Sequence, residues 1–359
     1  MWLTACAPDI VEQESYVFGT RVQIQAINAN KERTHKAIGL ILSEFDRLHV
    51  TYHAWKPSEL SRLNVEIAAG NHTMVSPELC TLLRQAKTLA AASDGLFDPG
   101  IGTLVNMWGF HDDEFAEHPP APDKISAWLK SPAGMANLRI TETPEDHNLC
   151  RISSTNKALA IDFGGYLKGV ALDRAAGILR AHGIRDALIN IGGNIMALGS
   201  KSGHPWSVGI QHPRGKGVMA TLELRDGEAI GISGDYRRYF QHQGRRYHHL
   251  LDPRSGKPAK GAIMVAVLVA PGNKAGLYSD VLNKPLFIVE KQAWPAMAKR
   301  LGATMSMRMH ADGELEIGAA LLPRLKFIGK APSYRVVEQV NQAKATNSKK
   351  ATATRARPH

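Results

Sequence analysis

The sequence predicts a mixed α/β protein of the α+β class, built as one large domain around a central strand, helix and strand. In residues 158–199, two short apolar runs flank a stretch in which apolar residues recur at helical spacing. A glycine pair follows each apolar run, as expected where a strand ends in a tight turn. Beyond this unit, alternating polar and apolar residues are typical of antiparallel strands. We therefore expect a central βαβ unit combined with antiparallel strands.

Composition and charge limit the classes of protein to which this chain can belong. Hydrophobic residues make up 44% and charged residues 21% of the 359 residues, and no run approaches the 18 apolar residues of a membrane span. The formal charge is +11, of which residues 341–359 supply five Lys or Arg charges and no acid. We expect residues 336–359 to form a basic, disordered tail that aids solubility or is weakly attracted to a membrane. No recognition motif accompanies the tail, so nucleic acid is not an expected partner.

The three cysteines, Cys6, Cys80 and Cys150, show neither metal-ligand spacing nor a disulfide framework. Cys6 follows Leu3-Thr4-Ala5, which is typical of the end of a bacterial lipoprotein signal, although only Met1 and Trp2 stand before that pattern. We expect residues 1–13 to be a truncated lipoprotein-type leader or a linker, with a possible lipid anchor at Cys6. A chance match is the alternative.

Periodicity and breaker residues predict the elements of the first half of the domain, which spans residues 14–335. In order, we expect a strand pair or one bulged strand around Gly19 (14–26), an amphipathic helix (31–50), a proline-containing loop that caps a short helix (52–64), a second helix (76–92), a loop that is either a core lid or a ligand wall (93–110), a surface excursion (112–123) and a short helix (124–129).

The second half is expected to be richer in strands. After the central unit we expect strands at 205–210, 217–224 and within 228–240, a strand at 245–251, a strongly apolar strand at 262–270, a helical stretch at 284–300 interrupted by Pro285 and Pro295, and a hairpin at 304–317 around Asp312-Gly313.

The two glycine pairs, at 164–165 and 192–193, stand at expected strand ends, where the backbone can approach a ligand closely. Lys168 stands where the central helix begins, so its ammonium group and the first-turn amides can bind one phosphate or pyrophosphate. The stretch contains neither G-x-x-x-x-G-K-[ST] nor G-x-G-x-x-G, so it is neither a Walker A loop nor a Rossmann motif. The alternative is two ordinary tight turns with a lysine in solvent.

Six carboxylates lie in or beside glycine-rich turns, namely Asp98, Asp162, Asp173, Asp235, Asp252 and Asp280. A buried carboxylate needs a donor, a cation or a metal, so together with Lys168, His248 and His249 they could build a phosphate-and-metal site. Any single one can instead be a turn-capping Asp, and Asp252 before Pro253 is a good example.

Eight motifs in order give the chain a resemblance to a known family. They are F-G-T at 18–20, S-E-L-S-R-L-N at 58–64, G-L-F-D-P at 95–99, W-G-F at 108–110, D-F-G-G-Y-L-K-G at 162–169, N-I-G-G-N at 190–194, S-G-D-Y-R-R-Y at 233–239 and H-H-L-L-D-P-R-S-G at 248–256. Together they resemble the FAD:protein FMN transferase family, the ApbE-like flavin transferases, over roughly residues 14–327.

The resemblance implies an enzyme of the bacterial periplasm, anchored to the inner membrane, with FAD in a cleft between two lobes. Such an enzyme breaks the pyrophosphate of FAD, joins FMN through a phosphoester to a Thr or Ser of a redox protein with a D-x-x-[ST]-G-A-T sequence, and releases AMP. Some relatives are magnesium-dependent FAD hydrolases that release FMN and AMP. A hydrolase and a non-catalytic FAD-binding protein therefore remain alternatives.

The resemblance also implies roles for single residues. His249 is the candidate general base, Asp280 a second catalytic residue, and Asp98 and Trp108 shape the pocket. His248 is expected on the opposite side of a strand from His249, in a structural role. The residues expected to contact the FAD are Gly19, Thr20, Ser58, Asn64, Asp98, Lys168, Asp173, Gly192, Gly193, Asn194, Ser233, Gly234, Asp235 and His249.

The implied magnesium site is where the chain departs from the family pattern. Asp280 and the carbonyl of Gly165 match the implied ligands, but Lys284 stands where the family has Thr. A protonated lysine has no lone pair and cannot bind a metal ion, and Pro285 disfavours a helix at this point. We expect either Lys284 to reach the pyrophosphate or Asn283 to replace the missing hydroxyl, and in both cases a weak metal site.

Overall fold

The computed structural model describes residues 10–28, 30–111, 116–142 and 149–338. The predicted anchor residue Cys6, most of the predicted leader and nearly all of the predicted basic tail lie outside these residues. Strand β1 begins at Ile10 and strand β19 ends at Val337, so the ordered strands extend slightly beyond the predicted domain limits of 14 and 335.

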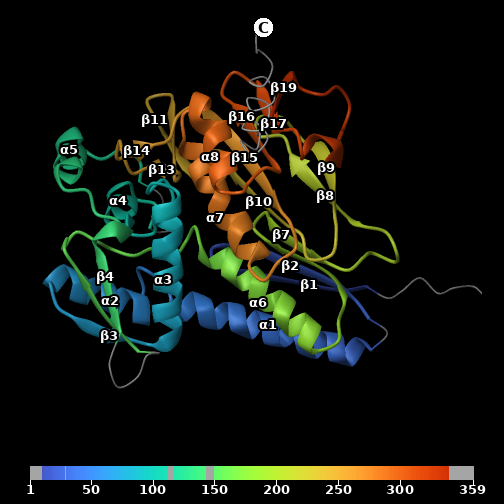
Figure 1. The fold of residues 1–359 in the computed structure, drawn as a ribbon, viewed down its shortest axis with the longest axis horizontal. Coiled ribbons are helices and arrows are strands. Elements are labelled where there is room, and N and C mark those ends of the chain that lie inside the picture. Colours follow the sequence, from blue (N-terminus) through green and yellow to red (C-terminus); the bar gives the residue numbers. More distant parts are fainter. Residues whose placement is uncertain (1–9, 29, 112–115, 143–148, 339–359) are drawn as a thin grey trace, which may run out of the picture.

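A nine-stranded sheet crosses the molecule in the order β1-β2-β6-β7-β10-β15-β16-β17-β19 (Figure 1). Every neighbouring pair is antiparallel except β17 and β19, which are parallel. The strands are β1 (Ile10–Val17), β2 (Thr20–Ile27), β6 (Asp186–Ile191), β7 (Asn194–Leu198), β10 (Ala229–Gly234), β15 (Ala262–Val269), β16 (Ser306–His310), β17 (Leu315–Gly318) and β19 (Tyr334–Val337). The predicted mixed α/β class with antiparallel strands is confirmed.

Two hairpin turns of this sheet follow directly from the sequence. Phe18 and Gly19 connect β1 to β2, and Gly192 and Gly193 connect β6 to β7. All four residues have positive φ, between 57° and 94°, as a two-residue hairpin turn of this kind requires. Three of the four are glycine, for which this conformation carries no steric penalty.

Three helices cover one face of the sheet, and a smaller sheet covers the other. On the first face lie α1 (Lys31–Thr51), α6 (Leu167–Ala181) and α7 (Ala275–Ile288), with α6 packed against both α1 and α7 (Figure 1). On the second face, β8 (Trp206–Gln211), β9 (Val218–Leu224) and β18 (Leu325–Phe327) enclose an apolar cluster with β10 and β15. The burial pattern of β8 alternates strictly, as predicted for a strand with one solvent face.

Residues 59–154 form a second body beside the large sheet, which we call the helical lobe. It contains α2 (Glu59–Ala69), β3 (Thr73–Val75), α3 (Pro77–Ala92), α4 (Gly102–Met107), α5 (Pro122–Lys130), the 3₁₀ turn η1 (Met135–Asn137), β4 (Leu138–Glu142) and β5 (Cys150–Ser154). Its three strands pair in the order β3-β5-β4.

The remaining elements are short. They are β11 (Tyr239–His242) paired with β12 (Arg245–His248), β13 (Leu251–Asp252) paired with β14 (Lys257–Pro258), η2 (Lys291–Ala293), α8 (Trp294–Arg300) and η3 (Leu322–Arg324). The stacked rings of Phe240 and Tyr247 pack the β11–β12 hairpin against Trp108 of the helical lobe.

The first strand of the expected βαβ unit is absent, so this prediction was wrong. Residues 158–163 are extended but make only one isolated bridge, between Ala160 and Ile101. Asn64 satisfies their backbone instead, because its side chain accepts from the amide of Ile161 and donates to the carbonyl of Ile161. The amide of Asp162 donates to the carbonyl of Pro99. An apolar run therefore became a loop because a side chain and a neighbouring loop supply the hydrogen bonds of a strand.

Pro285 does not interrupt the helix, contrary to expectation. Helix α7 continues through Pro285 to Ile288, and the carbonyl of Pro285 accepts from the amide of Val289 at 2.9 Å. Nearly all of α7 is buried between β10, β15 and α6. Tertiary packing thus outweighs the local cost of an internal proline. Pro295, by contrast, lies in the first turn of α8, where a proline is tolerated because its missing amide has no partner within the helix.

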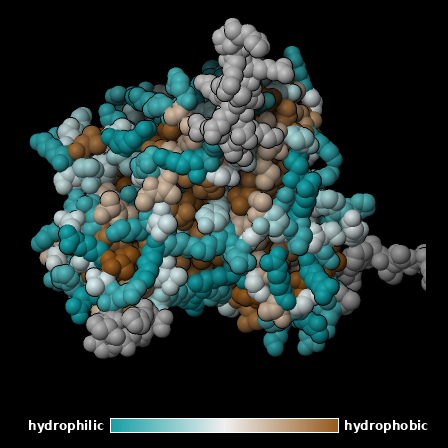
Figure 2. All heavy atoms as spheres, viewed as in Figure 1, coloured by the Kyte–Doolittle hydropathy of each residue, from teal (hydrophilic) through white to brown (hydrophobic). Residues whose placement is uncertain are grey.

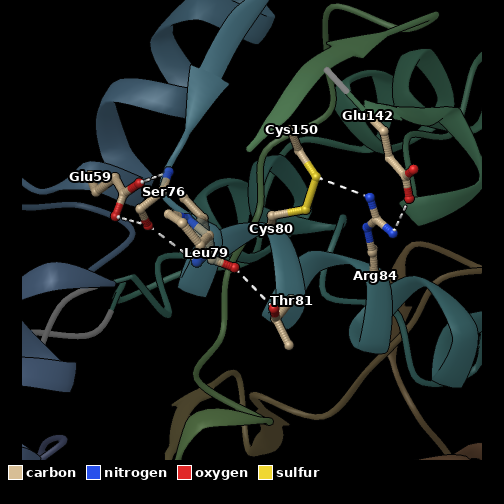
Figure 3. Close-up of a disulfide and its surroundings, with 9 residues drawn as sticks. Glu59, Ser76, Leu79, Cys80, Thr81, Arg84, Glu142 and Cys150 are labelled. Atoms are coloured by element: carbon tan, nitrogen blue, oxygen red, sulfur yellow. Dashed lines mark hydrogen bonds and ion pairs between the residues drawn. A yellow bond between two sulfur atoms is a disulfide. The ribbon is translucent and has the colours of Figure 1, made fainter. Parts of the chain in front are cut away.

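A disulfide bond joins Cys80 of α3 to Cys150 of β5, with the two Cα atoms 5.7 Å apart (Figure 3). The expectation that the cysteines form no disulfide framework was wrong. Arg84 donates to Cys150 Sγ at 3.3 Å and forms an ion pair with Glu142. The partners are 70 residues apart, and only the pairing of β5 with β3 and β4 brings Cys150 beside α3.

The surface seen in Figure 2 is mostly hydrophilic, and its apolar side chains appear in separate areas between polar ones. Within the described residues, no helix is both long enough and apolar enough to cross a membrane.

Candidate active site

A cavity of about 1030 Å³ lies where the helical lobe meets one end of the large sheet. Its walls come from the β1–β2 turn, the end of α1, the loop at 96–111, the start of α6, the β6–β7 turn, the end of β10, residues 249–251 and α7. The volume suits a ligand of the size of a dinucleotide. The cavity therefore lies between the sheet and the helical lobe, as the cleft between two lobes was expected to lie.

The structure brings most of the predicted site residues into this one cavity. Its walls include Gly19, Thr20, Asp98, Gly165, Lys168, Gly192, Asn194, Ser233, Gly234, His249, Asp280 and Lys284. They come from seven separate segments of the chain, so the fold and not the sequence spacing brings them together.

Five predicted ligand contacts lie outside the cavity wall, and two of them support the helical lobe. Ser58 caps the N-terminus of α2, where its hydroxyl accepts from the amide of Ser61. Asn64 holds Ile161 in place through its two backbone hydrogen bonds. Both side chains therefore have structural roles in the described fold.

The other three also have structural partners. The Asp173 carboxylate accepts from the amides of Gly276 and Leu277 and so caps the N-terminus of α7. Asp235 forms ion pairs with Arg214 and Arg246. Gly193 belongs to the β6–β7 turn and lies outside the wall.

Asp98 and Asp173 both have raised pKa values, but only one of them lies in the cavity wall. Burial raises the pKa of Asp98 to about 6, against the opposing effect of hydrogen bonds from the amides of Met135 and Gly100. Burial likewise raises the pKa of Asp173 to about 6. Asp98 lines the cavity, whereas Asp173 does not.

Trp108, which was expected to shape the pocket, also lies outside the cavity wall. Its indole nitrogen donates to the carbonyl of Gly256 at 2.8 Å.

The charged centre of the cavity is Asp280, which is almost completely buried on α7. Its Oδ2 accepts from the amide of Gly169 at 3.1 Å and lies 3.8 Å from the Lys168 Nζ. Its Oδ1 accepts from the ammonium group of Lys284, and the side chain of Asn194 donates a further hydrogen bond. The carboxylate is thus surrounded by donors on all sides.

Burial and these neighbours determine the protonation states of Asp280 and Lys284. Burial alone would raise the pKa of Asp280, but the ammonium groups of Lys168 and Lys284 lower it to about 2. Burial lowers the pKa of Lys284 to about 8, and the charge of Asp280 limits the effect. At neutral pH the cluster therefore consists of a carboxylate and two ammonium groups.

A magnesium ion does not fit this arrangement. The implied ligands are Asp280 and the carbonyl of Gly165, but the ammonium group of Lys284 already contacts both the carboxylate and the backbone carbonyl of Asp280. The Asn283 amide, the expected substitute for the missing hydroxyl, bonds instead to Ser233 and Ser279. Among the described residues, no three His, Cys, Asp or Glu side chains are grouped to hold a metal ion.

The first glycine turn forms the start of α6 beside this cluster. Asp162 accepts from the amide of Gly164 at 2.7 Å and from the Trp55 indole at 3.3 Å, which fixes the turn. Lys168 Nζ donates to the carbonyl of Gly164 at 2.8 Å. The amides of Leu167 and Gly169 already donate to Phe163 and Asp280. The Lys168 ammonium group therefore lies at the positive end of the α6 dipole, an arrangement suited to a phosphate group.

His249 and His248 occupy different environments, as strand alternation predicts. His249 lines the cavity, and its Nδ1 lies 3.1 Å from the carbonyl of Arg238. A carbonyl can only accept, so Nδ1 carries the proton and Nε2 carries a free lone pair. His248 is outside the wall, with its Nε2 3.0 Å from the carbonyl of Ala259.

The pKa of His249 differs from the expected value near neutrality. Burial, together with the charge of Arg238, lowers it to about 3. The ring is consequently neutral throughout the physiological range, which is the form that can accept a proton.

Several wall residues were missed in the sequence. The aromatic or imidazole side chains are Tyr16, Phe18, His49, Tyr52, His53, Trp55, Phe110 and His111, and the cations are Lys56, Arg237 and Arg238. The rings of Trp55 and His111 meet edge to face at 5.4 Å, and Arg237 donates to the carbonyl of Gly192 at 3.1 Å. Phe18, Phe110, Arg237 and Arg238 belong to the quoted motifs, and the loops at 52–57 and 93–110 show a clustering of aromatic residues with Pro and Gly, but neither signal assigned these side chains to the site.

A sheet-and-helix fold with a cationic, glycine-lined cavity of this size is typical of proteins with a site for a phosphorylated ligand. The ApbE family model matches residues 18–307, and the chain belongs to this family.

Known relatives agree with this assignment. A protein of Rhodobacter capsulatus named FAD:protein FMN transferase is 37% identical over 326 residues, which are 91% of this chain and 60% of the relative, so the chain spans less than two thirds of that protein. The crystal structure of the ApbE protein of Thermotoga maritima superposes with a TM-score of 0.78 at 27% identity, covering 88% of this chain and 99% of that one. The flavin transferase ApbE of Vibrio cholerae gives a TM-score of 0.74 at 25% identity, covering 89% and 100%.

Proposed function

We propose that this chain is an FAD:protein FMN transferase. The observation that carries the proposal is the grouping of Lys168, Asp280 and Lys284 at the start of α6, in the same cavity as a neutral His249. The names of its relatives support FAD as the substrate and a protein as the acceptor.

The reaction needs charge neutralisation and positioning more than covalent chemistry from the protein. A hydroxyl oxygen of the acceptor forms a bond to the phosphorus of the FMN half, and the bond from that phosphorus to the bridging oxygen breaks. AMP leaves with the bridging oxygen. His249 Nε2 takes the hydroxyl proton and can return it to the AMP phosphate. Lys168, together with the positive end of the α6 dipole, holds the phosphate oxygens.

The proposed acceptor is a redox protein with a D-x-x-[ST]-G-A-T sequence, whose Thr or Ser receives FMN. Incubating the full chain with FAD and a peptide of this sequence, then measuring the peptide mass, tests the proposal. A mass increase of one FMN group supports a transferase. Free FMN and AMP with unmodified peptide would indicate an FAD hydrolase, and bound FAD without turnover a flavin-binding protein.

By this proposal, magnesium reaches Asp280 only by displacing the Lys284 ammonium group and therefore binds weakly. The support is the position of Lys284, whose ammonium group contacts the carboxylate that a metal would need.

The proposed location is the bacterial periplasm, with a lipid at Cys6 as the anchor to the inner membrane. The support within the described residues is the buried Cys80–Cys150 disulfide, because structural disulfides persist in oxidising compartments. Labelling cells with a radioactive fatty acid, in the wild type and in Cys6→Ala, tests the anchor.

A further inference from the structure

We propose that Lys284 is a catalytic residue whose ammonium group contacts the diphosphate of the substrate and, together with Lys168, takes the place of a divalent metal ion. The inference rests on the proposed function and specifies how its phosphate site works. It predicts transfer that needs no metal.

The position of Lys284 is the first step of the argument. Only 14% of its side chain is exposed, and it lines the cavity from α7. A Cβ built on Gly165 would lie 3.2 Å from the Lys284 Cε. The lysine side chain therefore crosses the first glycine turn at close range, and its ammonium group lies where the turn presents its backbone to the cavity.

The donor count of the two lysines leaves capacity for a ligand. A lysine ammonium group has three donors. Lys284 donates to Oδ1 and to the backbone carbonyl of Asp280, which leaves one donor for a phosphate oxygen. Lys168 donates to the carbonyl of Gly164, which leaves two. Asp280 holds both ammonium groups in place, and it does not need to touch the substrate.

The charge at this point is positive without any metal. Two ammonium groups and one carboxylate sum to one positive charge, and the N-terminus of α6 adds a partial positive charge. In a site with Thr at position 284, a divalent ion beside Asp280 and Lys168 would give two positive charges. Lys284 thus supplies one fixed positive charge where a metal would supply two.

This charge acts on the step in which the bridging bond of the diphosphate breaks. As the acceptor oxygen bonds to phosphorus, negative charge grows on the bridging oxygen that leaves with AMP and on the non-bridging oxygens. An ammonium group that is already in place in a partly enclosed site stabilises this charge. Unlike a metal ion, it does not have to bind to the protein before the reaction.

The test compares the full wild-type chain with Lys284→Thr, which restores an oxygen ligand one helical turn from Asp280. Lys274→Thr is the matched control, because it makes the same change at the exposed N-cap of the same helix, outside the cavity. FMN transfer to the acceptor peptide, or release of AMP, is measured with EDTA and with excess magnesium. We expect equal wild-type and Lys274→Thr rates in both conditions. In EDTA, the rate of Lys284→Thr should be about 100-fold lower than that of the wild type. Excess magnesium should raise the rate of Lys284→Thr at least about tenfold.

A second readout does not depend on activity. Binding of Mn²⁺ as a probe, followed by electron paramagnetic resonance, should be undetectable in the wild type at concentrations that saturate Lys284→Thr. Tight wild-type Mn²⁺ binding, or wild-type transfer abolished by EDTA, would overturn the inference. If no condition yields transferred FMN or AMP, the proposed function fails, and the Mn²⁺ comparison still decides whether Lys284 excludes the metal. If Lys284→Thr does not fold, the wild-type response to EDTA and its Mn²⁺ binding decide.

Discussion

Asp280 and Lys284 lie one turn apart on the buried helix α7, and the Lys284 ammonium group contacts both the carboxylate and the backbone carbonyl of Asp280. Because both side chains are nearly enclosed, each depends on the other to remain charged inside the protein. Removing one partner of a buried ion pair destabilises a protein strongly, because the other charge stays buried without a partner. Replacing both partners by apolar residues has a much smaller effect on stability.

Asp280→Ala should therefore lower the free energy of unfolding by roughly 3 kcal/mol, because it leaves the Lys284 ammonium group without its counter-ion. The double variant Asp280→Ala/Lys284→Met should recover most of that loss. Urea unfolding of both variants and of Lys284→Met alone measures the coupling between the two residues. Additive effects of the two single changes would show that the pair is not coupled.

His249→Ala should reduce the rate of FMN transfer by about 10²–10⁴-fold and leave FAD affinity nearly unchanged, because the ring acts on the acceptor proton. Since burial lowers the His249 pKa to about 3, its ring is already neutral at pH 5. The rate profile between pH 5 and 8 should accordingly show no loss of activity from protonation of His249. Equal loss of turnover in His248→Ala, measured per folded molecule, would contradict the separate roles of the two rings.

Lys168→Ala should weaken FAD binding by about 10- to 100-fold, the usual effect of losing a hydrogen bond to a charged group. The lysine faces the cavity at the start of α6, where it can contact the diphosphate. Quenching of flavin fluorescence during titration measures the affinity. Lys274→Ala serves as the control. If Lys168→Ala and Lys274→Ala bind FAD with equal affinity, Lys168 does not contact the diphosphate.

Asp173→Asn should reduce stability without affecting FAD affinity. Each carboxylate oxygen accepts from one amide at the N-terminus of α7, and an asparagine can satisfy only one of the two. We expect a loss of about 1–2 kcal/mol in the free energy of unfolding. Flavin titration of the same variant is the second measurement, and weakened FAD binding at full folding would return Asp173 to the ligand site.

The double variant Cys80→Ala/Cys150→Ala should lower the free energy of unfolding by roughly 4 kcal/mol in the chain-entropy treatment of a loop of this length. The disulfide closes the segment that carries the cavity wall at 96–111. The wild-type chain should show a similar loss in reducing buffer. Unchanged unfolding in reducing buffer would mean that the bond does not stabilise the described fold.

The local sequence determined most of the elements, because periodicity and turn chemistry act over a few residues. The hairpins at Gly19 and Gly192-Gly193 and the helix α1 follow from such signals. The ordered set of glycine, aspartate and histidine motifs likewise indicated the family, and most of the site residues that it implied lie in the cavity wall.

Tertiary structure alone decided the features that depend on partners distant in the chain. Residues 158–163 form a loop because Asn64 supplies hydrogen bonds from another helix. Cys80 meets Cys150 only through the pairing of β5, and α7 passes through Pro285 because its surroundings bury it. Above all, the sequence places Lys284 four residues after Asp280, but only the packed α6 and α7 bring Lys168 to the other side of that carboxylate. Burial and the neighbouring charges then set the pKa values of Asp280 and Lys284, since desolvation and Coulomb energies depend on distances in the folded chain.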